Sequence, residues 1–259
     1  MGALRALGRV AILAIVYPIL GMTAIFLLAM EGGQTPRYLR RVQVLARIWH
    51  CISCKVLNIH IKGFGLSRLP SGGALLVANH AGTPDIFVLG SCVDIFFVSK
   101  AEVANWPLVG WLTRLGGTLY VVREKRMQVH EVILKIAERL DMGFSVLLFP
   151  EGTAGAEETT LPFKTAHFES ASRSGKPVVP VSIIYHDGGT PSVACWVDKT
   201  FGEHIWGLLT LAKLEVSVKI HPPLSAEKER RVLARKSREQ VDAGMIELRE
   251  RYELERTRE

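Results

Sequence analysis

Serine hydrolases and nucleotide hydrolases are recognised by short glycine-containing motifs, and this chain has neither. It contains no G-x-S-x-G nucleophile elbow and no G-x-x-x-x-G-K-[ST] phosphate-binding loop. Internal repeats and long linkers are also absent. Because 48% of the residues are apolar and only 22% are charged, extended disorder away from the ends is excluded as well. The length suits one sizeable folded domain with an appendage.

Cysteine is scarce: the chain has four, and only Cys51 and Cys54 form a C-x-x-C pair. A zinc site of this type needs a second ligand pair, and a redox motif of this type goes with a strand-containing βαβ pattern. No second pair exists, and the residues around Cys51 have a helical pattern. We therefore expect two small apolar helix residues, whose reduced state fits a cytosolic face.

Acidic residues are nearly missing between residues 31 and 70, where Glu31 is the only one. The basic residues of the same segment are Arg37, Arg40, Arg41, Arg47, Lys55, Lys62 and Arg68. A basic cluster next to an apolar segment suits an anionic membrane surface, where each cation contributes about 1 kcal/mol. No recognised nucleic-acid-binding motif accompanies the cluster, so the expected partner is a lipid bilayer and not nucleic acid.

Charged residues are absent from residues 10–30, a run of apolar character preceded by Arg5 and Arg9. Its length is about that needed to cross a hydrocarbon core of ~30 Å, and it exceeds the usual apolar region of a cleaved signal peptide. We therefore expect a retained anchor. Pro18 and Gly21 lie in mid-run and can bend the helix, so spanning the bilayer and entering one leaflet are both open. The excess of basic residues after the run places the downstream chain on the cytoplasmic side.

Residues 35–56 form a second, amphipathic helical pattern. One side carries Leu39, Val42, Leu45, Ala46, Ile48, Trp49 and Ile52, and the other carries Arg37, Arg40, Arg41 and Arg47. Such a pattern fits a helix lying at a membrane interface. The sequence thus predicts an N-terminal two-helix membrane anchor over residues 1–56.

Downstream of residue 56, short apolar runs alternate with helical patterns, and several runs are apolar throughout, as in strands covered on both faces. We predict an α/β fold over residues 57–224, with a central, mostly parallel sheet flanked by helices. The predicted strands are 56–61, 74–78, 95–99, 118–122, 145–149, 178–184, 193–197 and 216–221. The predicted helices are 84–92, 107–115, 127–141, 163–174 and 204–213, followed by a charged C-terminal helix within residues 225–259.

His80 and Asp85 follow the predicted strand 74–78, in the sequence N-H-A-G-T-P-D over residues 79–85. A strand-to-helix turn can fold the carboxylate back onto the imidazole, which fixes the tautomer of the histidine and stabilises its protonated form. By chance this spacing occurs in about one chain of such composition in five. Asp85 is equally explained as a first-turn residue favoured by the helix dipole, and His80 as a packed histidine.

Two further polar clusters follow predicted strands. The sequence F-P-E-G-T occupies residues 149–153, and G-T-L-Y-V-V-R occupies residues 117–123. Because α/β proteins bind ligands at the carboxyl ends of their strands, three clusters in such positions indicate one site. Arg123 is a natural anchor for a phosphate or carboxylate, although an arginine at a strand end is also a common surface charge.

In this combination the chain resembles the PlsC-type lysophosphatidic acid acyltransferase family of glycerolipid acyltransferases. Four ordered blocks carry the resemblance: H-x4-D at residues 79–85, the block at 117–123, F-P-E-G-T at 149–153 and V-P-V at 179–181. The stretches S-K-A-E at 99–102, W-P-L-V-G-W at 106–111 and P-F-K at 162–164 also fall where the family has similar sequences.

The resemblance implies that His80, held by Asp85, takes the proton of a lysolipid hydroxyl, which attacks an acyl thioester of coenzyme A or acyl carrier protein. The thioester is already activated, so no covalent acyl-enzyme, metal or other cofactor is implied, and one base can supply about 10²–10⁴-fold. The residues that it implies for the acceptor are Arg123, Glu151, Gly152, Thr153, Lys100 and Lys164. Apolar side chains expected either to line an acyl groove or to pack in the core are Trp106, Leu108, Trp111 and Leu112.

Two departures from the family pattern concern the acceptor. Many members have arginine after F-P-E-G-T, where this chain has Ala154, and glycine two residues after P-F-K, where it has Ala166. Both departures, with S-K-A-E-V-A at 99–104, are similar to the branch that acylates lyso-ornithine lipid. The first expectation is synthesis of phosphatidic acid from 1-acylglycerol 3-phosphate, and the second is acylation of lyso-ornithine lipid or another lysolipid. A non-catalytic lipid-binding protein of this fold is the third.

Overall fold

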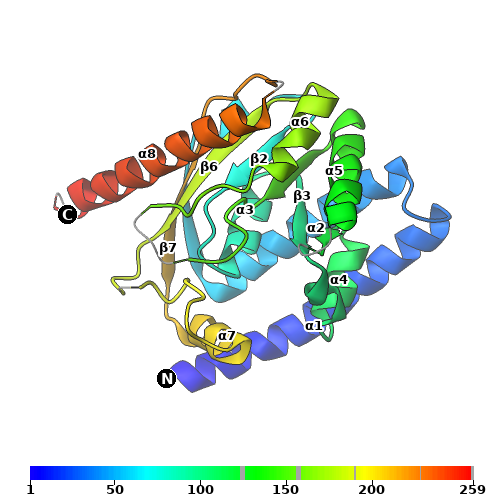
Figure 1. The fold of residues 1–259 in the computed structure, drawn as a ribbon. Coiled ribbons are helices and arrows are strands. Elements are labelled where there is room, and N and C mark those ends of the chain that lie inside the picture. Colours follow the sequence, from blue (N-terminus) through cyan, green and yellow to red (C-terminus); the bar gives the residue numbers. More distant parts are fainter. Residues whose placement is uncertain (123–125, 156–158, 190, 228, 258–259) are drawn as a thin grey trace.

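The computed structural model describes all residues except 123–125, 156–158, 190, 228 and 258–259. Within the described part, strands form one mixed sheet in the order β1-β7-β6-β2-β5-β3-β4 (Figure 1). The strands are β1 (Ile59–Phe64), β2 (Leu75–Ala78), β3 (Ile95–Lys100), β4 (Leu119–Val121), β5 (Ser145–Leu148), β6 (Val178–Tyr185) and β7 (Leu214–Ile220).

The α-helices are α1 (Gly2–Met30), α2 (Pro36–Leu57), α3 (Pro84–Cys92), α4 (Val109–Leu115), α5 (Arg126–Asp141), α6 (Glu169–Ser174), α7 (Phe201–Thr210) and α8 (Arg230–Arg256). Short 3₁₀ turns are η1 (Leu66–Arg68), η2 (Ala101–Asn105) and η3 (Ala166–Phe168).

Five neighbouring strands, β6, β2, β5, β3 and β4, run parallel, so their carboxyl ends meet at one edge of the sheet. β7 pairs antiparallel with β6 and parallel with β1, so these two outer strands run the other way. The predicted α/β architecture with a mostly parallel sheet is confirmed.

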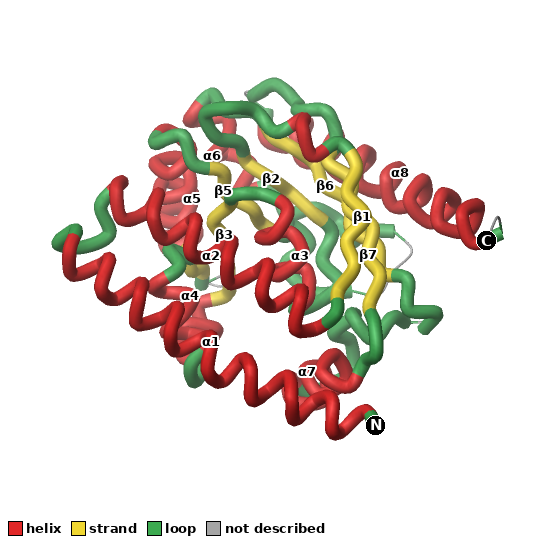
Figure 2. Tube along the Cα trace, turned by 180° about the vertical axis from the view of Figure 1, so that it is seen from behind, coloured by secondary structure: helices red, strands yellow, loops and turns green. Residues whose placement is uncertain are grey.

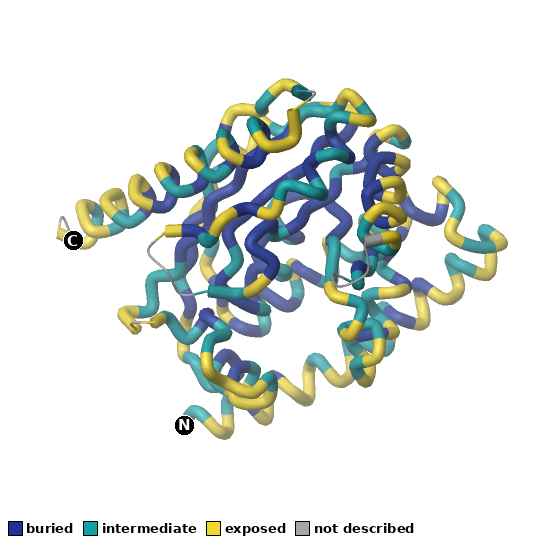
Figure 3. Tube along the Cα trace, in the orientation of Figure 1, coloured by how far each residue is buried: buried dark blue, intermediate teal, exposed yellow. Residues whose placement is uncertain are grey.

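Helices cover both faces of the sheet, which is why its central strands are apolar throughout. Successive side chains of a strand point to opposite faces. Leu75 and Val77 of β2 pack in one core cluster, and Leu76 and Ala78 pack in the other. Helices α5, α6 and α8 contribute to the first cluster, and α3, α7 and the C-terminal end of α2 contribute to the second (Figure 2). Figure 3 shows the buried sheet between the exposed outer surfaces of these helices.

The strand predicted at 193–197 is wrong, because the backbone there forms turns. Asp187 accepts hydrogen bonds from the backbone N–H of Val193 at 2.6 Å and from the Ser192 hydroxyl at 3.0 Å. The N–H of Trp196 donates to the carbonyl of Ala81 at 2.9 Å. An acidic side chain and a remote turn thus take the hydrogen-bonding groups that a sheet neighbour needs.

Two predicted helices begin at other residues. α7 begins at Phe201 because Thr200 and Glu203 form a capping box, in which each side chain accepts a hydrogen bond from the other's backbone N–H. The T-x-x-E pattern was the available signal for this start. The helix expected at 163–174 begins only at Glu169, after the η3 turn.

Both N-terminal helices form, yet only α1 among the described helices has the length and composition of a membrane span. Its most apolar window has a mean hydropathy of 2.4 and is 11% buried. The apolar side of α2 lies largely inside the protein, where Tyr38, Leu39 and Val42 belong to the same core cluster as the sheet. The expected two-helix anchor is therefore corrected to one helix, because α2 is a covering helix of the sheet. The boundary at residues 56/57 stays a prediction.

The apolar helix α1 lies along the surface of the domain and is fixed to it at both ends (Figure 2). Near its start, the Arg5 guanidinium donates to the carbonyl of Thr210 at 2.6 Å, and that of Arg9 donates to the carbonyl of Leu211 at 2.7 Å. These acceptors lie at the C-terminal end of α7, where carbonyl groups lack intrahelical partners. Further along, the Trp111 ring of α4 lies directly over Gly21, where a Cβ atom would collide with it.

Candidate active site

The polar clusters predicted at strand ends lie along the carboxyl edge of the sheet. His80 follows β2 and Glu151 follows β5, and these strands are neighbours. Tyr185 ends β6, the neighbour of β2 on its other side. The side chains of three adjacent strand ends therefore meet where α/β folds place their ligands.

The imidazole of His80 and the carboxylate of Asp85 are hydrogen-bonded across the turn between β2 and α3. Nδ1 of His80 lies 2.7 Å from Oδ2 of Asp85. This contact places the ring proton on Nδ1 and leaves the lone pair on Nε2. Nε2 makes no hydrogen bond with a described residue, and the His80 side chain is 22% exposed. A substrate hydroxyl can therefore reach a nitrogen that is ready to accept a proton.

Asp85 is completely buried, and both of its oxygens are hydrogen-bonded. Besides His80, Oδ2 accepts hydrogen bonds from the N–H groups of Ala81 at 2.7 Å and Gly82 at 3.1 Å. Oδ1 accepts one from the Tyr185 hydroxyl at 2.7 Å. Such donors stabilise a carboxylate away from water, where an unpaired charge is very unfavourable. The orientation of Asp85 toward His80 is thereby fixed.

Tyr185 is a site residue that the sequence analysis missed. Burial raises the pKa of its phenol well above the usual value, and the adjacent Asp85 carboxylate adds to this rise. The hydroxyl therefore stays protonated and remains a donor to Asp85 at physiological pH. The available sequence signal was weak, since a tyrosine at the end of an apolar strand has no fixed spacing from the histidine.

Glu151 is also buried, and it holds the backbone around the site. Its Oε1 accepts a hydrogen bond from the N–H of His80 at 2.9 Å, and Oε2 accepts one from the N–H of Leu161 at 2.8 Å. Burial raises the pKa of the Glu151 carboxyl, while these two hydrogen bonds act in the opposite direction. The side chain joins the turn after β2 to the loop after β5. Its expected role in acceptor binding stays a prediction.

Two neighbouring side chains complete the support of His80. The Phe149 ring stacks on the imidazole with a centroid distance of 4.0 Å and an interplanar angle of 15°. Asn79 bonds to both backbone groups of Ile183 in β6, accepting from its N–H and donating to its carbonyl, each at 2.9 Å. β2 and β6 are thus tied together just before the catalytic turn, defined here as residues 80–85.

Gly152 and Lys164 lie against each other beside this turn. Gly152 has φ +79°, a conformation that favours glycine, and a Cβ atom there would collide with the Lys164 side chain. The N–H of Lys164 donates to the carbonyl of Pro150 at 2.9 Å, which fixes its loop. The side chains of Lys164 and Thr153 are exposed. A cation therefore stands at the edge of the site, as expected for an anionic acceptor group.

The two remaining predicted residues are not brought into this cluster by contacts in the described part. Lys100 ends β3, which β5 separates from β2, and its exposed side chain makes no hydrogen bond or ion pair with a described residue. Arg123 lies outside the described residues. Its place after β4 keeps it on the same edge of the sheet in sequence terms only.

The residues expected to line a groove or to pack in the core have different surroundings. Trp111 and Leu112 contact α1 at Gly21, and the Leu108 side chain is 47% exposed. Trp106 stacks in an aromatic cluster with Phe201, at a centroid distance of 4.5 Å, and with Trp196 at 6.1 Å. These side chains join α4 and η2 to the membrane helix and to the start of α7.

Comparison with known proteins identifies the chemistry of this arrangement. An Acyltransferase family model matches residues 60–184, which include His80, Asp85 and Glu151. A lyso-ornithine lipid O-acyltransferase of Rhodobacter capsulatus is 34% identical to this chain, over 83% of the chain and 79% of the relative. The chain belongs to the PlsC-type acyltransferase family. A 1-acyl-sn-glycerol-3-phosphate acyltransferase of Neisseria gonorrhoeae is 30% identical, over 56% of the chain and 58% of the relative.

The fold of this acyltransferase is that of a solved relative. The crystal structure of the lysophosphatidic acid acyltransferase PlsC from Thermotoga maritima superposes with a TM-score of 0.71 and 24% identity. The superposition covers 96% of this chain and 98% of the relative. The arrangement of sheet and covering helices is therefore shared along nearly the whole chain.

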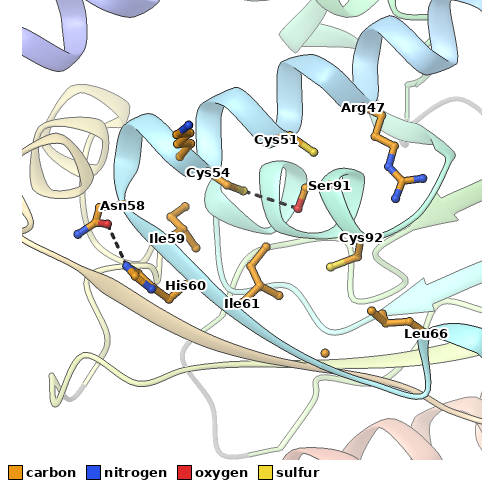
Figure 4. A pocket seen from close by; sticks show the side chains of 12 residues that line it. Arg47, Cys51, Cys54, Asn58, Ile59, His60, Ile61, Leu66, Ser91 and Cys92 are labelled. Atoms are coloured by element: carbon orange, nitrogen blue, oxygen red, sulfur yellow. Dashed lines mark hydrogen bonds between the residues drawn. The ribbon is translucent and has the colours of Figure 1, made fainter.

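A hollow of about 540 Å³ elsewhere in the acyltransferase is lined by α2, β1 and the end of α3 (Figure 4). Cys51, Cys54 and Cys92 line it, and the described cysteines are all free. Burial raises the pKa of Cys54 to about 12 and that of Cys92 to about 11. These thiols stay protonated at neutral pH, which supports the interpretation of the C-x-x-C pair as apolar helix residues. No group of three metal-ligating side chains occurs among the described residues.

Proposed function

We propose that this acyltransferase moves an acyl group from a thioester to the hydroxyl of a lysolipid, with His80 as the general base. The observation that carries the proposal is the hydrogen bond from His80 Nδ1 to Asp85, with Nε2 free of protein partners and open to solvent. A base must lie within hydrogen-bond reach of the proton that it takes, and Nε2 is the open atom.

The reaction follows from this geometry. Nε2 of His80 accepts the hydroxyl proton as the lysolipid oxygen attacks the thioester carbonyl carbon. The imidazolium formed is stabilised by the Asp85 carboxylate at 2.7 Å. The carbon–sulfur bond then breaks, and the thiolate of the carrier leaves and takes up a proton. No bond between the acyl group and the protein is required, and the carrier is coenzyme A or acyl carrier protein.

The relatives favour a lyso-ornithine lipid as the acceptor. The Rhodobacter capsulatus protein and a lyso-ornithine lipid O-acyltransferase of Pseudomonas aeruginosa, 33% identical, each align over 79% of their own length. Ala154 stands where many phosphate-acceptor enzymes of the family have arginine. Ornithine presents a carboxylate and an ammonium group in place of a phosphate. 1-Acylglycerol 3-phosphate is the second candidate, supported by the Neisseria relative.

The acceptor head group is proposed to bind between the loops after β3, β4 and β5. The residues for this role are Lys100, Arg123, Glu151, Gly152, Thr153 and Lys164. Lys164, beside Gly152, is the cation held nearest the catalytic turn by contacts within the described residues. Its ammonium group suits a carboxylate or a phosphate equally.

The membrane helix is proposed to lie in the cytoplasmic leaflet and not to cross the bilayer. Both of its halves contact the domain, through Arg5 and Arg9 at one end and Gly21 further along. A helix fixed in this way cannot span without breaking those contacts. Its outward side carries exposed apolar residues: Leu4, Leu7, Val10, Ile12, Ile15, Ile19, Met22, Ile25, Phe26 and Met30. Lysolipid in that leaflet is then near the site.

A thiol-release assay with purified protein, oleoyl-coenzyme A and a panel of lysolipids tests the proposal. We expect release with lyso-ornithine lipid above that with 1-acylglycerol 3-phosphate, and none without acceptor. His80→Ala is expected to lower kcat by about 10²–10⁴-fold because the base is lost. Turnover unchanged in His80→Ala overturns the mechanism. A protein that binds lysolipid and releases no thiol with either donor carrier is a lipid-binding protein and not an enzyme.

A further inference from the structure

His204 of α7 is a buried histidine that the reaction described above does not use. Its relative exposure is 1%, and its Nδ1 atom has no hydrogen-bond partner among the described residues. Burial lowers the pKa of His204 to about 4, so the ring is neutral at physiological pH. An apolar side chain would fill this space without an unpaired ring nitrogen. A polar group that is retained in such a place needs another explanation.

The other ring nitrogen of His204 contacts the catalytic turn. Nε2 lies 3.3 Å from the backbone N–H of Thr83 and accepts its hydrogen bond. The two preceding N–H groups, of Ala81 and Gly82, both donate to Asp85. Three successive N–H groups of the turn are thus directed alternately to the catalytic carboxylate and to α7.

The segment before α7 holds the same turn from a second direction. The N–H of Trp196 donates to the carbonyl of Ala81 at 2.9 Å, and the Trp196 ring stacks on His204 at 5.5 Å with an interplanar angle of 6°. Gly82 is packed so closely that a Cβ atom would collide with the carbonyl of Ala194. The turn is therefore enclosed by residues more than 100 positions away in the sequence.

α7 can act as a firm support because both of its ends are fixed. The capping box of Thr200 and Glu203 closes its N-terminus. At the other end, Arg5 and Arg9 of the membrane helix bind its last carbonyl groups. His204 lies between these two points, so its position relative to the sheet is set by contacts outside the site.

We propose that His204 is a positioning residue for acyl transfer, which holds the Thr83 amide so that Ala81 and Gly82 keep Asp85 directed at His80. The proposal rests on the proposed role of His80 as base. Loss of the acceptor frees the turn, and small displacements of a catalytic group have large effects on the rate. Substrate binding is unaffected because His204 is buried behind the turn.

Glutamine and methionine at position 204 give a matched pair, because both are unbranched and of similar size, and only glutamine has an oxygen that can accept from Thr83. We expect His204→Met to lower kcat by about 10–100-fold with both Michaelis constants within about threefold of wild type. His204→Gln is expected to retain kcat within about fivefold. His50→Met is the control, since His50 is buried and has an unpartnered Nδ1 atom, and no contact of its side chain with the catalytic turn occurs in the described structure.

Three results overturn the proposal: a folded His204→Met enzyme with wild-type kcat, a His204→Gln enzyme as slow as His204→Met, or an equal loss of kcat in His50→Met. Hydrogen–deuterium exchange on the wild-type protein serves if His204→Met does not fold. A protected Thr83 amide is expected, and rapid exchange there contradicts the proposal. If His80→Ala stays active, the base assignment fails. If His80→Ala is inactive while His204→Met is fully active, only the present inference fails.

Discussion

The Asp85 carboxylate accepts hydrogen bonds from three groups besides His80, and Tyr185 is the only side chain among them. The two backbone donors reach Oδ2, which also faces the histidine. The Tyr185 hydroxyl alone reaches Oδ1. At the scale of single residues, this makes the tyrosine the contact that decides whether the second oxygen is satisfied.

Tyr185→Phe removes that donor and leaves Oδ1 buried without a partner. We expect a loss of about 1–3 kcal/mol in the free energy of unfolding, the usual effect of an unsatisfied buried acceptor. The value of kcat should fall about tenfold because Asp85 can then rotate away from His80. Chemical denaturation and steady-state kinetics measure the two effects.

Tyr38→Phe is the matched control for this change. The Tyr38 hydroxyl is equally buried and donates to the carbonyl of Leu115 at 2.7 Å, remote from the catalytic turn. It should lower stability by a similar amount and leave kcat unchanged. Wild-type kcat in Tyr185→Phe would show that the tyrosine has only a structural role.

Elements are joined here by side chains that act at helix ends. Arg9 of α1 is 6% exposed, and its Nη1 atom lies within 3.3 Å of the carbonyls of Leu208, Leu209 and Leu211. The guanidinium thus supplies donors to carbonyls that the helix α7 leaves unpaired. The membrane helix is in this way part of the support of the site.

Arg9→Met is expected to lower the free energy of unfolding by about 1.5–3 kcal/mol, the range for hydrogen bonds to a charged group. A fall in kcat should accompany it, because α7 carries His204. Thermal unfolding and thiol release measure both. Arg37→Met on the exposed surface of α2 should change stability by no more than about 0.5 kcal/mol. Equal effects of the two substitutions would argue against the α1–α7 contact.

The whole molecule presents its longest exposed apolar stretch on α1, with Trp206 of α7 and Leu108 beside α4 also exposed. Figure 1 shows α1 passing along one side of the domain beneath α7 and α4. Exposed apolar surface of this extent marks an interaction site, and lipid is the partner that suits a lysolipid acyltransferase. Basic residues of α2 add attraction to anionic head groups.

Ile19→Glu tests this orientation, because the Ile19 side chain is 52% exposed on α1. Burial of one isoleucine contributes about 1.5–3 kcal/mol, so binding to anionic vesicles should fall about tenfold or more. Turnover of acceptor dispersed in detergent should be retained. Ile246→Glu on α8, where Ile246 is 49% exposed, should leave vesicle binding unchanged. Equal vesicle binding by both variants would place the membrane contact elsewhere. Sedimentation with vesicles measures binding.

The sequence by itself determined the α/β class, most strands and the His80–Asp85 pair, because these depend on local periodicity and on a turn only six residues long. Even the error at 193–197 was a local pattern read correctly and placed wrongly, since Asp187 and Ala81 take the hydrogen bonds there. Neighbouring residues in a sequence cannot indicate which distant groups will meet.

Only the tertiary structure decided how the pair is held. Tyr185 reaches Asp85 from the next strand, and His204 reaches Thr83 from a helix anchored by Arg9. The same packing turned the apolar side of α2 into the core and laid α1 along the domain. Amphipathicity fixes that a helix buries one face, whereas the surface that covers this face, lipid or protein, depends on contacts formed by the whole fold.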